Sequence, residues 1–121
     1  MAKGKILIID DEAEVRGFLQ DYFEDREYKV ISACDGQQGW EFFQKENFDL
    51  VICDMMMPRM MGIEFLRLAK GAKPDQKVIM MTGVKEESMT AKAKDLGCTH
   101  YLTKPVSLTN LEAKAAECFA S

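Results

Sequence analysis

The sequence lacks the features of a membrane-spanning, zinc-binding or disulfide-rich protein. No apolar run approaches the roughly 20 residues that a membrane-spanning helix needs. With one histidine, His100, and four cysteines that form no C-x-x-C pair, a zinc site is not expected. We interpret the cysteines as small, buried, apolar thiols in a reducing compartment: Cys34, Cys53, Cys98 and Cys118.

The charge balance and the N-terminal residues argue against further classes of protein. Twenty acidic and sixteen basic residues give a net charge of −4, which disfavours a chain that itself binds nucleic acid or an anionic membrane. Residues 1–5 run directly into an apolar stretch without a signal peptide, so we expect a cytoplasmic protein. The length of 121 residues, without repeat or linker, predicts a single domain over 1–121.

What the chain does have is an alternation between apolar runs of strand length and segments with helical period. The predicted strands are Lys5–Ile9, Lys29–Ala33, Leu50–Cys53, Lys77–Met81 and Tyr101–Thr103. Five strand–helix units predict an α/β protein of the (βα)5 type. Short loops and right-handed crossovers then favour a doubly wound parallel sheet with helices on both faces.

The five predicted helices differ in how clearly their apolar faces are marked. The first carries a stripe at helical spacing that we expect to be buried: Val15, Phe18, Leu19, Tyr22 and Phe23. The second starts near Gly36 and the third follows Gly62. The fourth, about 86–96, is weakly apolar and ends at Gly97, a residue suited to a helix terminus. Ser107 is the expected N-cap of the last helix.

Two of the apolar strands end at aspartate. Asp10 and Asp11 follow the first strand, and Asp54 follows the third. The carboxyl ends of parallel strands meet at one rim of a sheet, where ligands bind, and the strand order 2-1-3-4-5 makes strands one and three neighbours. Three carboxylates a few ångströms apart repel one another by roughly 4 kcal/mol per pair at an effective dielectric near 20, so the cluster needs a cation. With a lysine nearby, this rim suggests a Mg²⁺ site that handles a phosphoryl group.

Four segments together carry a resemblance to a known family. They are Asp10-Asp11, the loop 54–62 with the pattern D-x-x-M-P-x-M-x-G, Thr82-Gly83, and 93–105 with A-x-x-x-G-C-x-x-Y-x-x-K-P. In this order and spacing the chain resembles the receiver domain of bacterial response regulators, from Ile6 to the last helix. Cys98 stands where alanine is usual. The resemblance implies a flavodoxin-like three-layer sandwich with strand order 2-1-3-4-5.

The resemblance implies a phosphoacceptor and a metal site. Asp54 is expected to accept a phosphoryl group from the phosphohistidine of a sensor kinase or phosphotransfer protein, which forms an acyl phosphate. Asp11 is expected to bind Mg²⁺ directly and Asp10 through water. Asp54 and the backbone carbonyl of Met56 complete the protein ligands, and Mn²⁺ is an expected substitute. By this reading the protein is not an enzyme beyond its own phosphorylation and slow self-dephosphorylation.

The resemblance also assigns a second cation and a switch. Lys104 is expected to contact a phosphoryl oxygen, and the Thr82 hydroxyl another. Tyr101 is expected to turn inward behind Thr82, which would alter the surface formed by the fourth helix, the fifth strand and the last helix. That surface would contact a downstream protein target, and dimerisation on phosphorylation is left open. The peptide bond between Lys104 and Pro105 is expected to be cis.

Two residues are expected to govern the lifetime of the acyl phosphate. In the family, the second residue after the acceptor and the second after the threonine flank the path of the attacking water. Here these are Met56 and Val84, and neither side chain can orient a water. We therefore expect slow dephosphorylation.

Several alternatives deserve weight beside this reading. Taken singly, Asp10-Asp11 could cap a helix, Asp54 could form an Asx turn and Lys104 could be a surface lysine. A flavodoxin is disfavoured because acidic residues follow the first strand, and a haloacid-dehalogenase-type phosphatase because Met55 and Met56 follow Asp54. A phosphorylation-independent binding module stays open, as does a receiver from a longer regulator or hybrid kinase, although no effector sequence is seen after the last helix.

Overall fold

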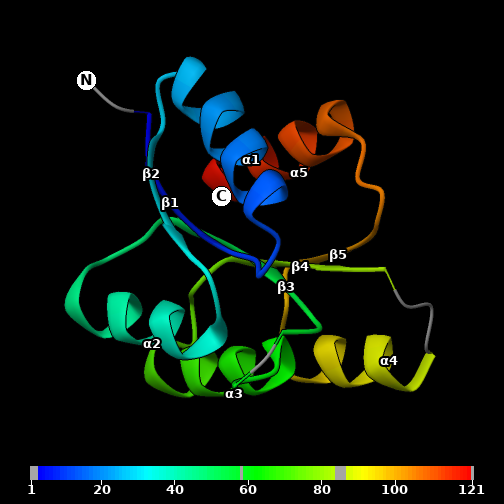
Figure 1. Cartoon of the computed structure of the whole chain (residues 1–121). Helices are drawn as coiled ribbons and strands as arrows, with labels where there is room; N and C mark the ends of the chain where they lie inside the picture. Colours follow the sequence, from blue (N-terminus) through cyan, green and yellow to red (C-terminus); the bar gives the residue numbers. More distant parts are fainter. Residues whose placement is uncertain (1–2, 58, 84–86, 121) are drawn as a thin grey trace.

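Strands and helices alternate along the whole described chain. The computed structural model describes residues 3–57, 59–83 and 87–120. The elements are β1 Lys5–Ile9, α1 Ala13–Asp25, β2 Lys29–Ala33, α2 Gly36–Lys45, β3 Leu50–Asp54, α3 Gly62–Ala72, β4 Val78–Thr82, α4 Glu87–Asp95, β5 His100–Thr103 and α5 Leu108–Ala120. Figure 1 shows one sheet between two helical layers, with α1 and α5 on one face and α2, α3 and α4 on the other. The predicted (βα)5 fold is confirmed.

The sheet is parallel and has the strand order β2-β1-β3-β4-β5. This order confirms the prediction, and the direction of winding reverses between β1 and β3. Ile9 is paired with Cys53 in the register, so the aspartates that follow them leave the sheet side by side. Three strands differ from their predicted bounds by one residue: β3 gains Asp54, β5 gains His100, and β4 both begins and ends one residue later than predicted. The ladder pairs Asp54–Met81, Ile79–His100 and Thr82–Thr103 account for the added residues.

The core lies on both faces of the sheet. Leu7 and Ile9 of β1 join the cluster under α2 and α3, whereas Ile6 and Ile8 join the cluster under α1 and α5. Strands that are covered on both faces must be apolar at every position, since successive side chains point to opposite faces. The continuous apolar runs in the sequence have this cause.

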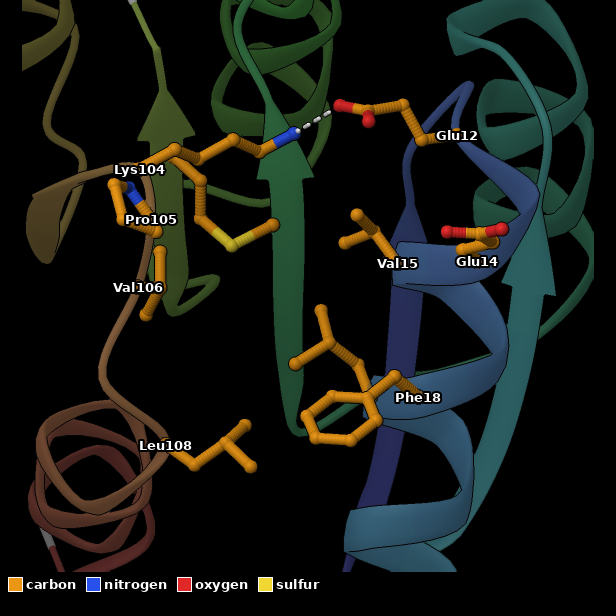
Figure 2. Close-up of a pocket in the computed structure, with 10 residues that line it drawn as sticks. Glu12, Glu14, Val15, Phe18, Lys104, Pro105, Val106 and Leu108 are labelled. Atoms are coloured by element: carbon orange, nitrogen blue, oxygen red, sulfur yellow. Dashed lines mark hydrogen bonds and ion pairs between the residues drawn. The ribbon is translucent and has the colours of Figure 1, made fainter.

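Helix α1 departs from its predicted buried stripe at one residue. Leu19 and Phe23 are buried, and Val15 and Tyr22 are partly buried, but Phe18 is 60% exposed. The prediction for Phe18 is wrong because α5 does not cover this part of α1. Instead, Phe18 lines a groove of about 580 Å³ between α1 and the segment that joins β5 to α5. Figure 2 shows this groove with Phe18 on the α1 side.

The cysteines follow the expectation of buried thiols only in part. Cys53 and Cys118 are buried and Cys98 is half-buried, but Cys34 is exposed. The prediction for Cys34 is wrong because this residue follows the edge strand β2 at the rim of the sheet, where no element covers it.

The helix termini agree with the sequence signals. Helix α4 buries Ala93, with Met89 and Leu96 partly buried, and the chain leaves it through Gly97 at a φ of +92°. Glycine adopts this left-handed conformation without a steric penalty. The Ser107 hydroxyl accepts a hydrogen bond from the Asn110 amide at 3.3 Å, as expected of an N-cap. Throughout 3–57, 59–83 and 87–120, each helix is too short or too polar to cross a bilayer.

Candidate functional site

Four carboxylates meet at the carboxyl ends of β1 and β3. Asp10, Asp11, Glu12 and Asp54 each place an oxygen within 4.8 Å of the others. Asp10 and Asp54 are buried, whereas Asp11 and Glu12 are exposed. The structure thus brings together the three aspartates that the sequence singled out. Glu12 adds a fourth carboxylate that sequence reasoning did not include, although its place directly after Asp10-Asp11 was a usable signal.

The Lys104 ammonium lies among these carboxylates. It donates hydrogen bonds to Asp10 Oδ2 at 2.9 Å and to Asp54 Oδ2 at 3.2 Å. It also contacts Glu12 Oε1 at 3.2 Å, the interaction that is dashed in Figure 2. Lys104 follows β5, where its amide donates to the Thr82 carbonyl at 2.6 Å and the peptide bond to Pro105 is cis. One lysine therefore links the ends of β1, β3, β4 and β5.

Local hydrogen bonds fix the loop after β1. The Glu12 amide donates to Asp10 Oδ1 at 2.9 Å, which leaves Oδ2 for the lysine. The Arg16 guanidinium donates to the Asp10 carbonyl at 2.8 Å and ties the same turn to α1. The buried Asp10 carboxylate thus has partners for both of its oxygens, as a buried charge requires.

Glycine permits the close approach of α3 to β3. A Cβ on Gly62 would overlap the carbonyl oxygen of Asp54, so a larger residue would push the helix away. The Gly62 amide donates to the Met55 carbonyl at 2.9 Å, and the Met55 amide donates to the Met81 carbonyl at 2.7 Å. These contacts anchor both ends of the loop that follows β3, of which the structure describes residues 55–57 and 59–61.

The electrostatics of the site favour a bound cation. Burial and the nearby charge of Asp10 together raise the pKa of Asp54 from 3.8 to about 6, although Lys104 partly offsets both effects. Burial lowers the pKa of Lys104, but hydrogen bonding to Asp10 and the charges of both aspartates outweigh it, so the net shift is upward. Lys104 stays protonated, but its single positive charge does not bring the pKa of Asp54 back to its ordinary value.

Thr82 and Tyr101 lie on the neighbouring strands β4 and β5. Thr82 is the last residue of β4 and is buried. Tyr101 is paired in register with Met80 and packs against the core cluster on the α3 and α4 side. The Tyr101 hydroxyl is buried and has no hydrogen-bond partner among the residues that the structure describes. The ring therefore points into the protein, although its hydroxyl forms no hydrogen bond with a described residue there.

Comparison with known proteins identifies the family. The sequence profile of the response regulator receiver domain matches residues 6–116. This chain belongs to that family. The four segments that carried the resemblance all lie within the matched range.

The most similar relatives of this receiver domain differ in length. This chain is 35% identical over 111 residues to sporulation initiation phosphotransferase F of Bacillus subtilis. The aligned region covers 92% of this chain and 90% of that protein. This chain is 37% identical over 114 residues to "Probable transcriptional regulator ycf27" of Porphyridium aerugineum. Here the aligned region covers 94% of this chain but 47% of that protein. This chain spans about half the length of most of the curated relatives it matches.

The fold of this receiver domain also has close structural neighbours. A CheY-like response regulator receiver domain protein from Methanospirillum hungatei superposes with a TM-score of 0.93 at 29% identity, over 96% of this chain and 93% of that one. The strand order and the helical layers described above are therefore those of a CheY-like receiver.

The donor set of this receiver domain fits a hard divalent cation. All four candidate side chains offer carboxylate oxygens, which Mg²⁺ prefers, and two of them are exposed enough to leave room for water ligands. The backbone of Met56 hydrogen-bonds the Asp54 carboxylate, so this loop residue lies at the same rim. Its side chain is 47% exposed. Val84, the other residue expected to tune dephosphorylation, lies outside the described residues.

Proposed function

We propose that this receiver domain takes a phosphoryl group onto Asp54 from the phosphohistidine of a sensor kinase or phosphotransfer protein, in a Mg²⁺-dependent reaction. The observation that carries this proposal is the position of Lys104. Its ammonium contacts both buried aspartates at the strand-order switch point, at 2.9 Å and 3.2 Å. A lysine held among carboxylates supplies the charge that a transferred phosphoryl group requires.

In the proposed reaction an Asp54 carboxylate oxygen attacks the phosphorus. The new O–P bond gives an acyl phosphate, the P–N bond of the phosphohistidine breaks, and its electron pair returns to the imidazole. Lys104 then exchanges its contact with Asp54 for one with a phosphoryl oxygen. Because catalysis of this transfer is mostly positioning and charge neutralisation, the site needs no further base.

The proposed metal ligands are Asp11, Asp10 through water, Asp54 and the Met56 carbonyl. When bound, Mg²⁺ neutralises phosphoryl oxygens and the carboxylates that would otherwise repel them. Mn²⁺ has the same preference for oxygen ligands and should substitute. Removal of the divalent ion should therefore abolish phosphorylation without unfolding the protein.

The proposed output runs through Thr82 and Tyr101. Thr82 offers its hydroxyl to a phosphoryl oxygen, and its shift gives Tyr101 a different environment at the surface of α4, β5 and α5. A downstream protein target reads that surface, with no direct contact to nucleic acid or membrane. The buried Tyr101 hydroxyl supports this proposal, because the protein has room for the ring in the inward position and no partner among the described residues fixes the hydroxyl there.

We further propose that residues 1–121 act as a single receiver unit in the cytoplasm, whose only chemistry is its own phosphorylation and dephosphorylation. The two kinds of relative, one of similar length and others about twice as long, fit a free-standing receiver and the receiver part of a longer regulator respectively. The reading frame and the neighbouring genes distinguish these two arrangements.

The experiment is a transfer assay with a small phosphodonor such as acetyl phosphate. Wild-type protein with Mg²⁺ should gain one phosphoryl group, and EDTA should prevent the gain. Asp54→Asn should not be labelled under either condition, whereas Asp21→Asn, which changes an exposed aspartate of α1, should be labelled like the wild type. Equal labelling of wild type and Asp54→Asn would refute the proposal.

A further inference from the structure

The loop that follows β3 is held, through Arg59 and Met60, to a second element on the far side of β1. Arg59 in this loop places Nη1 3.1 Å from Oδ2 of Asp35, which precedes α2. Asp35 follows the edge strand β2, and β1 lies between β2 and β3 in the sheet. The contact therefore crosses the end of β1, the strand that Asp10 follows. We call it the Asp35–Arg59 clamp.

The Asp35 carboxylate is buried, so its partners matter more than those of a surface charge. Its side chain is 6% exposed, whereas that of Arg59 is 71% exposed. Oδ1 accepts a hydrogen bond from the Gln38 amide at 2.8 Å and caps α2. Oδ2 is left for Arg59, beside a weak contact from the Cys34 thiol at 3.7 Å. A buried carboxylate that lost this guanidinium would be poorly compensated.

The backbone of the loop indicates that the clamp holds a definite conformation. Arg59 has a φ of +69°, a left-handed conformation that non-glycine residues adopt uncommonly and that the surroundings must maintain. The next residue, Met60, touches the start of α2 so closely that a Cβ on Gly36 would lie 2.5 Å from the Met60 carbonyl. The ion pair and this close backbone contact both tie the loop to α2.

Met56 lies between the two attachments of the loop. On one side, Met55 is bonded to β4 and to Gly62, and on the other side Arg59 is bonded to Asp35. Met56 itself hydrogen-bonds Asp54 through its backbone. We propose that Asp35 and Arg59 are positioning residues, which hold the loop so that the Met56 backbone is preorganised for the divalent cation. This inference rests on the proposed function.

The experiment compares two variants that break the clamp with one that does not. Arg59→Gln removes the guanidinium, and Asp35→Ser removes the carboxylate but keeps a side chain that can cap α2. The control is Arg67→Gln, which breaks a comparable ion pair with Glu64 on the exposed surface of α3. For each protein, Mg²⁺ affinity is measured by calorimetric titration, Gly62 amide exchange by NMR in EDTA, and global stability by urea unfolding.

Both clamp variants should weaken Mg²⁺ binding by about tenfold, as loss of a residue that orients a ligand does. Exchange at the Gly62 amide, which closes the loop onto Met55, should become faster in EDTA by more than the change in global stability explains. The double variant should bind Mg²⁺ no more weakly than either single variant, because one contact has been removed. Arg67→Gln should match the wild type in Mg²⁺ affinity and in Gly62 amide exchange.

The inference is overturned if Arg59→Gln binds Mg²⁺ and exchanges Gly62 like the wild type. Arg59 is largely exposed, so this variant should fold and decide the question even if Asp35→Ser does not. Failure of the inference alone leaves wild-type Mg²⁺ binding and Asp54 labelling intact. Failure of the proposed function removes both from the wild type, and the inference falls with it.

Discussion

At the scale of the residue, Asp54 combines two demands that oppose each other. A phosphoacceptor must present an ionised carboxylate, but Asp54 is only 4% exposed and stands beside Asp10. Burial and that neighbouring charge raise its pKa to about 6 despite Lys104. The metal-free protein therefore carries a carboxylate that destabilises the fold at neutral pH, and the proposed divalent cation would remove this conflict.

The first prediction is that Asp54→Asn stabilises the metal-free protein at neutral pH. The pKa of Asp54 in the folded protein lies above its unfolded value, so the protonated side chain favours folding over the ionised one. This contribution to stability is fully present below about pH 4 and is lost as the pH rises through 6. An amide does not ionise, so the variant should be more stable by about 1–3 kcal/mol at pH 7.5. Urea unfolding in EDTA should show that this gain shrinks by more than half at pH 4.5. A gain that grows toward acid pH would contradict the sign.

The second prediction concerns the lifetime of the acyl phosphate. The thioether of Met56 is exposed at the rim of the site and cannot orient a water for attack on phosphorus. Met56→Asn should therefore speed dephosphorylation severalfold, and Met56→Leu, which is apolar too, should leave the rate unchanged. Val84→Glu is the corresponding change at the second tuning position. Decay of the phosphorylated protein after donor removal measures the rates. Equal rates for the asparagine and leucine variants would refute the argument that a side chain unable to orient water slows dephosphorylation.

At the scale of the element, the sequence predicts the strands, helices and site residues that follow from apolar pattern and local chemistry. The apolar runs of β1 and β3 mark buried parallel strands, and the aspartates at their ends mark the rim. Phe18 and Cys34 escape such reasoning, since their exposure depends on which distant element fails to cover them. The Asp35–Arg59 clamp escapes it for a similar reason, whereas the place of Glu12 directly after Asp10-Asp11 was a usable signal. Ion pairs between residues far apart in sequence leave no periodic signal.

The third prediction tests the close approach of α3 to β3. Gly62→Ala should lower stability by several kcal/mol, because the new Cβ overlaps backbone rather than a flexible side chain. It should also weaken Mg²⁺ binding, since the displaced backbone belongs to the acceptor loop. Gly71→Ala is the matched control in the same helix, where a Cβ meets nothing within 4 Å. That change should stabilise by about 0.5–1 kcal/mol through helix propensity. Similar losses in both variants would contradict the account.

At the scale of the whole molecule, the candidate site lies at one rim of the sheet. The proposed output surface, formed by α4, β5 and α5, lies on one side of the molecule. Helix α4 contributes little apolar area to the core, with Ala93 buried and Met89 and Leu96 only partly so. A loosely held element beside the site can change position at a modest cost. The Tyr101 hydroxyl on β5 is buried and has no hydrogen-bond partner within 3–57, 59–83 and 87–120.

The fourth prediction is that a phosphoryl analogue changes that side of the molecule. Addition of beryllofluoride and Mg²⁺ should shift NMR resonances over 87–96 and 99–119 as well as around Asp54. Resonances of β2, the edge strand that lies beyond β1 and away from β4 and β5, should move least. The same titration with Tyr101→Ala should reduce the shifts in α4 and α5 but not those at the metal site. Shifts confined to the metal site in the wild type would contradict the proposed output.

The most direct test of the central claim locates the phosphoryl bond. Borohydride reduces an acyl phosphate to an alcohol, so a phosphorylated aspartate becomes homoserine, which peptide mass spectrometry can place in the sequence. After incubation with acetyl phosphate and Mg²⁺, homoserine should be found at position 54 and at no other aspartate, and EDTA should suppress it. Homoserine at Asp10 or Asp11 instead, or phosphorylated protein without any homoserine, would contradict the assignment of Asp54 as the acceptor.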